Sequence, residues 1–197
     1  MISDKNRPGF DQKMTAEEIN SRPIASYDGV VHIIRTASEL EQATRVLCRE
    51  TVLGFDTETK PAFQKGEINP ISLLQFAAAG AVYIIQLKHV RPSEQLGALL
   101  SNKLIIKAGI DINQDIAKLK NNIDCDYKGF IDVSLLAKDA GIKNFSMRGL
   151  AAVLLGVRIA KSMQVSNWAR STLLPSQIKY AATDAWISRE IYLRLRK

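Results

Sequence analysis

The 197-residue sequence contains only two cysteines, Cys48 and Cys125, and only two histidines. It has no CxxC pair and no cluster of Cys and His residues, which argues against a zinc site, and two isolated cysteines in an intracellular chain are typically reduced core residues. The longest apolar stretches, such as residues 149–157, are far shorter than the roughly 20 residues that a membrane-spanning helix needs. The N-terminus pairs no basic start with an apolar run, so no secretory signal is expected. The predicted location is intracellular, and cytoplasmic if the protein is bacterial.

The composition is that of an ordinary globular protein, with 46% hydrophobic and 24% charged residues. The net charge of +7 is distributed unevenly along the chain. Residues 141–197 hold 10 Lys and Arg against 2 Asp and Glu, a net charge of +8, whereas residues 1–140 hold 17 basic and 18 acidic side chains. A basic C-terminal third favours a polyanionic partner, nucleic acid first among them. A role in solubility alone explains the charge equally well.

The order of strand-like and helix-like segments predicts an α/β fold. Residues 1–27 are polar and predict an N-terminal arm with one short helix over 15–20, followed by a single domain over 28–197. Three successive strands over 51–59, 71–76 and 81–86 predict an antiparallel meander. Alternating strands and helices follow. The expected architecture is a mixed sheet, an antiparallel meander plus parallel strands, flanked by helices. The remaining expected strands cover 29–35, 104–108 and 129–132, and the expected helices cover 36–50, 92–101, 113–121 and a segment from Pro175.

Two acids, Asp56 and Glu58, stand at the end of an apolar strand. Residues i and i+2 of a strand point to the same face, so both carboxylates project together. Two like charges after a buried run are unfavourable unless a cation neutralises them, and hard divalent metals prefer carboxylate oxygens. A solvated strand end is the alternative, which the apolar residues 52–55 disfavour.

Tyr180 and Asp184 lie in a segment with a helical pattern and share a face as i, i+4 neighbours. The surrounding alanines and Trp186 indicate a packed environment, so Asp184 is either part of a site or a buried acid bonded to Tyr180. Asp115 begins the helix after the strand over 104–108, where an acid also favours the helix dipole. Asp111, close by, is easily confused with it.

In this order, the three acidic segments resemble the DEDD superfamily of 3′–5′ exonucleases. The first motif matches residues 54–59, the second residues 107–115, and the third residues 180–184. Members of the DEDDh branch have a histidine five residues before the last acid, where this chain has Lys179. With Tyr180 in its third motif, the chain instead resembles the DEDDy branch, which includes ribonuclease D and the proofreading domains of family A DNA polymerases. The stretches 166–168, 173–175 and 180–185 resemble the subgroup of the Werner syndrome protein exonuclease domain. The resemblance covers residues 30–195.

This resemblance implies a ribonuclease H-like fold and two divalent metal ions, Mg²⁺ or Mn²⁺. The implied metal ligands are Asp56, Glu58, Asp115 and Asp184, with Tyr180 orienting the attacking water. Thr59, Asn167 and Trp168 are expected substrate contacts, although core packing of Trp168 is an equal alternative to its stacking on a base. The implied partner is a single-stranded 3′ end, with DNA favoured over RNA. The basic residues Lys161, Arg170 and Lys179 are either phosphate contacts or a solvated face.

Three other functions remain open. A ribonuclease D-like RNA exonuclease uses the same motifs, although this chain has no room for the extra helical RNA-binding domains of ribonuclease D. A catalytically inactive module that binds nucleic acid is disfavoured, because all four acids and the tyrosine are present. The third alternative is a structural adaptor in which the acids have no function. Such a protein would show no metal-dependent change in thermal stability.

Overall fold

The computed structural model describes residues 9–197 except residues 11, 63, 65 and 68. Residues 1–8 of the predicted arm, and three positions in the link between the first two strands of the meander, lie outside the described residues. The strands are β1 (Val30–Ile34), β2 (Val52–Thr59), β3 (Ile71–Ala77), β4 (Ala81–Gln86), β5 (Ile106–Gly109) and β6 (Phe130–Asp132). The helices are α1 (Ala16–Asn20), α2 (Ala37–Leu47), α3 (Glu94–Ser101), α4 (Ile112–Leu119), α5 (Val133–Asp139), α6 (Met147–Leu150), the π-helix η1 (Ala151–Leu155) and α7 (Pro175–Leu195).

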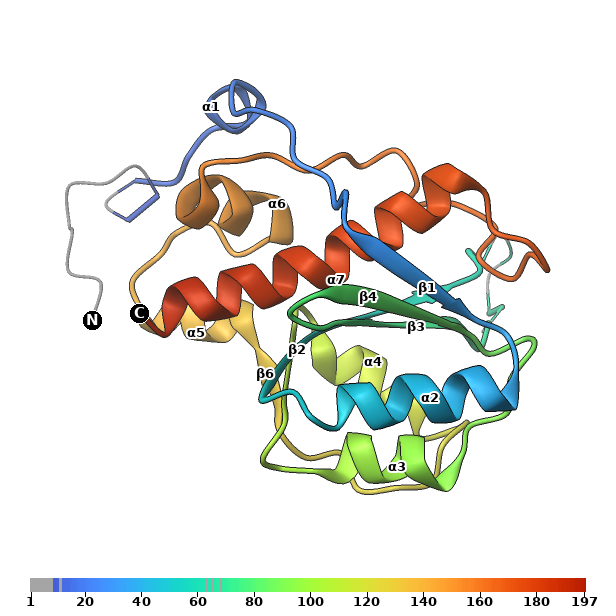
Figure 1. Cartoon of the computed structure of the whole chain (residues 1–197). Helices are drawn as coiled ribbons and strands as arrows, with labels where there is room; N and C mark the ends of the chain where they lie inside the picture. Colours follow the sequence, from blue (N-terminus) through green and yellow to red (C-terminus); the bar gives the residue numbers. More distant parts are fainter. Residues whose placement is uncertain (1–8, 11, 63, 65, 68) are drawn as a thin grey trace.

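The described strands form one mixed sheet in the order β1-β4-β3-β2-β5-β6 (Figure 1). Strands β2, β3 and β4 pair antiparallel, which is the predicted meander. Strand β1 pairs parallel with β4, and β2, β5 and β6 pair parallel with one another in that order. The predicted fold class, a mixed sheet flanked by helices, is confirmed.

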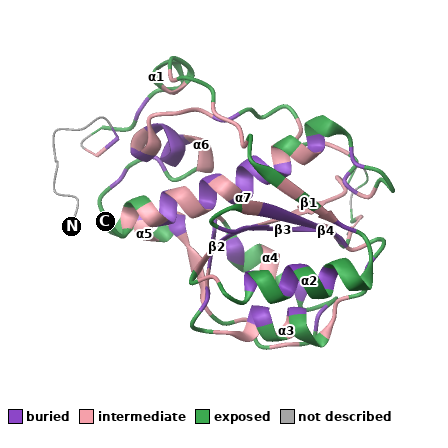
Figure 2. Ribbon diagram, in the orientation of Figure 1, coloured by how far each residue is buried: buried purple, intermediate pink, exposed green. Residues whose placement is uncertain are grey.

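The helices cover the two faces of the sheet as separate layers (Figure 1). Helices α2 and α3 pack on one face, and the long helix α7 runs across the other, with α5, α6 and η1 beside it. Alternate residues of a strand point to opposite faces. In β3, Leu74 and Phe76 therefore join the core under α2 and α3, whereas Leu73 and Ala77 pack under α7. Figure 2 shows the buried residues concentrated along the strands and the inward stripes of these helices.

The predicted helix over 36–50 begins as expected but ends earlier. Thr36 and Glu39 form the predicted capping box, in which each side chain accepts a hydrogen bond from the other residue's backbone N–H. The helix ends at Leu47, because the N–H groups of Arg49 and Glu50 donate to carbonyls three residues back rather than four. The last turn is therefore tighter than an α-helical turn, and the chain continues from it to β2.

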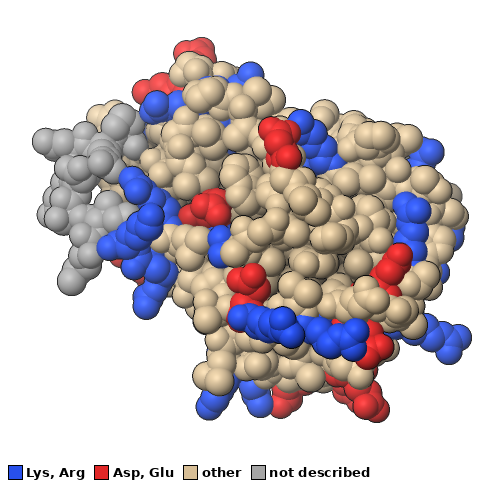
Figure 3. Space-filling view, viewed as in Figure 1, with Lys and Arg blue, Asp and Glu red and all other residues tan. Residues whose placement is uncertain are grey.

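Basic and acidic side chains are mixed over much of the surface in the view of Figure 3. Lys and Arg gather at the left edge of that view, beside the C-terminal end of α7. Among the described residues, no helix has the length and apolar character needed to cross a membrane.

Candidate active site

Strand β2 directs two carboxylates toward α7. Gly54, Asp56 and Glu58 share one face of the strand because they alternate with Phe55 and Thr57. Gly54 identifies this face, since a Cβ added there would lie 1.9 Å from the backbone oxygen of Ala185 in α7. Only glycine allows the helix backbone to approach the strand this closely. The predicted common face for Asp56 and Glu58 is therefore the face that α7 covers.

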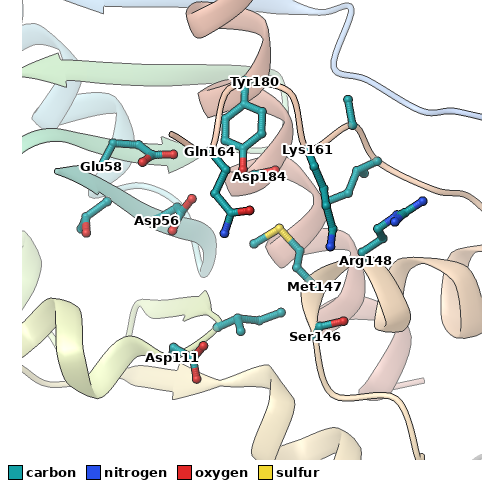
Figure 4. A pocket seen from close by; sticks show the side chains of 14 residues that line it. Asp56, Glu58, Asp111, Ser146, Met147, Arg148, Lys161, Gln164, Tyr180 and Asp184 are labelled. Atoms are coloured by element: carbon teal, nitrogen blue, oxygen red, sulfur yellow. The ribbon is translucent and has the colours of Figure 1, made fainter. Parts of the chain in front are cut away.

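Helix α7 brings Tyr180 and Asp184 to the same place. The helix begins at Pro175, as predicted. Proline is favourable in the first turn because the backbone N–H groups there have no partner within the helix. Ala181 and Ala185 are fully buried and keep the helix close to the sheet. Asp184 is 6% exposed and lies one turn after Tyr180, and the two side chains point into the same space as Asp56 and Glu58 (Figure 4).

The result is a compact group of three carboxylates. Asp56, Glu58 and Asp184 each offer an oxygen, and these oxygens lie within 4.8 Å of one another. They come from two segments more than 120 residues apart in the chain, so the group exists only because α7 packs on β2. This arrangement matches the expectation that these acids share a site.

Asp115 lies beside this group but is not one of its three members. Its Oδ1 accepts a hydrogen bond of 2.6 Å from the Thr57 hydroxyl, and Thr57 alternates with Asp56 and Glu58 along β2. Burial is the main cause that raises the pKa of Asp56 and Glu58, and the charge of Asp115 adds to it. Asp115 therefore approaches the end of β2 from α4, on the Thr57 side.

The turn before α4 brings a second acid, Asp111, to the site. Strand β5 ends at Gly109, where an added Cβ would lie 2.6 Å from the backbone oxygen of Phe55. Asp111 follows with a left-handed backbone (φ 56°), a conformation that Asp tolerates better than most residues. Its side chain is exposed and lines the same cavity as the three carboxylates (Figure 4). Sequence reasoning set Asp111 aside, so its presence in the cavity wall was not anticipated.

The carboxyl groups hold protons more tightly than free acids do. Loss of solvent around Glu58 and the charge of Asp184 raise the pKa of Glu58 to about 9, and burial raises that of Asp184 to about 7. Burial and neighbouring carboxylates also raise the pKa of Asp56 well above its usual range. The pKa of Asp115 rises to about 6, with the Thr57 hydroxyl opposing the effect of burial. Raised pKa values grouped in one place mean that burial and mutual repulsion disfavour the charged forms of these carboxyl groups, which is typical of functional sites.

The residues fit divalent metal ions. Asp184 Oδ1 is buried with no hydrogen-bond partner in the described structure, which is costly unless another group satisfies it. The three clustered carboxylates supply the oxygen ligands that Mg²⁺ and Mn²⁺ prefer, and binding a cation would remove their mutual repulsion. Asp115 adds a fourth oxygen donor at the edge of the group. The donor set therefore matches the metal chemistry that the sequence motifs imply.

The acids form one wall of a cavity of about 370 Å³, a volume suited to a small-molecule-sized group such as one nucleotide. The opposite wall carries no acid among the lining residues and two cations, Arg148 and Lys161 (Figure 4). Of the residues in this wall, only Lys161 was named from the sequence, because the wall is built from short or irregular segments without a periodic pattern. The other residues of this wall are Ser146, Met147, Ile159, Ala160 and Gln164.

The predicted substrate contacts have different outcomes. Trp168 is 1% exposed and packs in the core beside Tyr180, with ring centroids 5.9 Å apart, so its ring is not available to stack on a base and the packing alternative holds. Asn167 is exposed, but its side-chain oxygen accepts from Ala169 N–H and does not line the cavity. Thr59 lies half-buried at a register shift at the end of β2, also outside the cavity lining. Contacts from Asn167 and Thr59 to a substrate stay predictions.

Comparison with known proteins identifies the family. The sequence model of the 3′–5′ exonuclease family matches residues 31–197. The mouse bifunctional 3′–5′ exonuclease/ATP-dependent helicase WRN is 31% identical over 150 residues, which cover 73% of this chain and 11% of WRN. The chain thus spans about a tenth of that relative's length.

Two solved structures share the fold. The exonuclease domain of Nibbler from Aedes aegypti superposes with a TM-score of 0.80 at 24% identity, covering 87% of this chain and 91% of that domain. Escherichia coli RNase D, an exoribonuclease, superposes with a TM-score of 0.75 at 19% identity, covering 84% of this chain and 45% of RNase D. The sequence match over residues 31–197, the ribonuclease H-like fold and the carboxylate group on β2 and α7 agree, and the chain belongs to the 3′–5′ exonuclease domain family of the DEDD superfamily.

Proposed function

We propose that this chain is a DEDDy-type 3′–5′ exonuclease that removes nucleotides from single-stranded 3′ ends of DNA with the help of two divalent metal ions. The observation that carries the proposal is the group of three carboxylates within 4.8 Å in a nucleotide-sized cavity. Asp56, Glu58 and Asp184, with Asp115 beside them, would hold the metal ions. When bound, two such ions activate water and neutralise charge on the departing oxygen.

The protein's own residues organise the hydrolysis. Water attacks the terminal phosphorus, the bond from phosphorus to the 3′ oxygen breaks, and the products are a 5′-nucleotide and a shortened strand with a 3′ hydroxyl. Burial and the charge of Asp184 raise the pKa of Tyr180 above its ordinary value, so the phenol keeps its proton at neutral pH. A neutral hydroxyl suits Tyr180 to orient the water rather than to take its proton. Packing against Trp168 keeps the ring in place.

DNA is the preferred substrate in this proposal because residues 166–168, 173–175 and 180–185 resemble the Werner subgroup. An RNA strand, which differs by its 2′ hydroxyl, is the alternative. The test uses 5′-labelled DNA and RNA of one sequence, single-stranded and as recessed duplex ends. Each is incubated with Mg²⁺, Mn²⁺ or EDTA. A metal-dependent ladder that shortens from the 3′ end is expected, fastest on single-stranded DNA.

Asp56→Ala supplies the loss-of-function control for this assay. It should abolish the ladder while the strand still binds. Strands that bind but are never shortened by the wild-type protein would instead support an inactive nucleic-acid-binding module. Faster shortening of RNA than of DNA would replace the proposed substrate with the ribonuclease D-like alternative.

A matched pair of variants decides which acid of the α4 turn acts. Asp115→Asn should reduce the rate at least about 100-fold, because it removes a charge beside Asp56 and Glu58. Asp111→Asn keeps a residue that tolerates the left-handed backbone and should reduce the rate less than about 10-fold. A larger loss of rate in Asp111→Asn than in Asp115→Asn would indicate that Asp111, and not Asp115, is the fourth metal ligand.

A further inference from the structure

Hydrogen bonds of the arm backbone attach the N-terminal arm to two segments of the domain. Met14 N–H donates to the buried side chain of Asn144 at 2.9 Å, and the Asn144 amide donates back to the Met14 carbonyl at 3.1 Å. Further along, Arg158 N–H donates to the Pro23 carbonyl at 2.9 Å, and Ala25 N–H donates to the Arg158 carbonyl at 2.8 Å. The arm thus has defined positions on the domain surface (Figure 1).

Each of the two domain segments that the arm contacts continues into residues that line the cavity. Residues 146–148 follow the first anchor, and residues 159–161 follow the second, and both ranges line the wall opposite the acids. A third contact reaches α7, where Tyr27 N–H donates to the hydroxyl of Thr183 at 3.0 Å, next to Asp184. The arm therefore joins the wall of the cavity to the helix that carries the acids.

One arm contact reaches a cavity side chain itself. Arg148 lines the cavity, and one of its terminal nitrogens donates to the side-chain oxygen of Asn20 in α1. Its Nε is buried and has no hydrogen-bond partner. Within the described residues, Arg148 makes no ion pair with a carboxylate. In Figure 4 the Arg148 side chain extends along the rim of the cavity, away from the carboxylates, where Asn20 holds the guanidinium and its charge is unpaired within the described structure.

We propose that Arg148 binds a phosphate of the nucleic-acid strand and that Asn20 of the arm is the residue that positions it. This inference rests on the proposed exonuclease function and extends the substrate-binding surface to a segment that precedes the family match at residue 31.

The charges of the cavity give the physical reason. Asp56, Glu58, Asp184 and Asp111 line one side, and a phosphate brought toward them is repelled unless cations offset the charge. A guanidinium forms paired, charge-assisted hydrogen bonds with phosphate oxygens, provided that its plane is already oriented. Asn20 supplies that orientation without neutralising the charge, because an amide oxygen is uncharged.

The test measures binding of a labelled single-stranded DNA by fluorescence anisotropy in EDTA, over a range of salt concentrations. Arg148→Met should raise Kd and reduce the slope of log K against log salt by about 0.7, the contribution of one phosphate contact to a single strand. Asn20→Ala should raise Kd roughly 3- to 10-fold, the size of one hydrogen bond, and leave the slope unchanged because the cation remains. The double variant should bind no more weakly than Arg148→Met alone.

Asp28→Ala is the matched control for the arm. Asp28, the residue that directly follows the arm, forms an exposed ion pair of 2.9 Å with Lys179 and does not line the cavity, so this variant loses a contact at the end of the arm without affecting Arg148. Its Kd should not rise above that of the wild type, because the variant removes a negative charge and no cation. Thermal melting of all variants checks that the arm and the domain stay folded.

Three results would overturn the inference. An unchanged salt slope in Arg148→Met would show that no phosphate is bound there. Additive effects in the double variant, or an equal loss of affinity in Asp28→Ala, would show that the arm acts by general attachment and not through Arg148. These outcomes are distinct from a failure of the proposed function, which would appear as wild-type protein that binds strands in EDTA but never shortens them with metal.

Discussion

The two faces of the sheet are packed by different kinds of residue. Under α2 and α3 the core consists of large side chains such as Phe55, Phe76 and Leu96, all at most 1% exposed. Under α7, the small helix residues Ala181, Ala182 and Ala185 pack beside larger sheet residues such as Leu73 and Ile84. At Gly54 the helix backbone at Ala185 takes the space of a side chain. Large interlocking side chains contribute apolar burial, whereas small ones allow two backbones to approach. On the second face, the absence of a side chain at Gly54 allows the close contact that brings the acids together.

The faces also differ in how their buried polar groups are satisfied. On the α2 and α3 face the buried ammonium of Lys107 donates to two backbone carbonyls at the end of α3, at 2.8 and 3.2 Å. On the α7 face, buried polar atoms of Gln75, Trp168, Asp184 and Ser188 have no partner within the described structure. Unsatisfied buried groups cost stability and are expected mainly where function requires them. The comparison indicates that one face stabilises the fold and the other carries the chemistry.

The sharpest test of this division is Asp184→Asn, which keeps the shape of the side chain. The rate of strand shortening should fall at least about 1000-fold, or about 4 kcal/mol in the barrier, because a ligand of the carboxylate group is lost. Stability in EDTA at pH 8 should not fall, since a buried, repelled charge is removed. Single-turnover rates and thermal melts measure both effects. Glu190→Gln, on the same helix but outside the cavity, is the control.

The opposite result is expected from Leu53→Ala, on the other face of the same strand. Leu53 is 0% exposed, and truncation of such a leucine costs about 2–5 kcal/mol of the free energy of unfolding. The folded fraction should retain its rate within a few-fold. Urea unfolding gives the stability, and Leu104→Ala, at a position 77% exposed, gives the baseline. A large loss of rate in folded Leu53→Ala protein would contradict the division between the faces.

Gly54→Ala should affect stability and activity together. The added methyl group would lie 1.9 Å from the Ala185 oxygen, so α7 must move away from β2. We expect a loss of about 1–3 kcal/mol of stability and a lower rate, because Asp184 moves with the helix. Gly80→Ala is the matched control, since nothing lies within 4 Å of a Cβ there. Full activity with reduced stability would show that the close approach serves packing alone.

The smallest predicted effect is a pH dependence of stability. Glu58, Asp184 and Asp115 have raised pKa values in the folded protein, of about 9, 7 and 6. Acids with raised folded values contribute stability at low pH, and this stability is lost as pH rises through those values. The melting temperature in EDTA should therefore decline from pH 5 to 9, and the shift caused by Mg²⁺ should grow over the same range. A shift independent of pH would argue against metal binding by these carboxylates, and Asp56→Ala should remove the shift.

Much of the fold and part of the site follow from local patterns. The capping box at Thr36, the meander of β2 to β4 and the start of α7 at Pro175 all agree with expectation. Asp56 and Glu58 share a face because strands repeat every two residues, and Tyr180 and Asp184 share one because helices repeat every 3.6. Both inferences concern the direction of side chains within a single strand or helix, which follows from residue spacing in the sequence.

Distances between elements follow from packing and could not be read in the same way. The burial of Trp168, the hydrogen bond from Thr57 to Asp115 and the position of Arg148 opposite the acids depend on segments far apart in the chain. The sequence by itself determined which side chains could act and which way each points along its own strand or helix. Only the tertiary structure decided which of them meet, because the approach of α7 to β2 is set by the side chains, or their absence at Gly54, that lie between the two backbones.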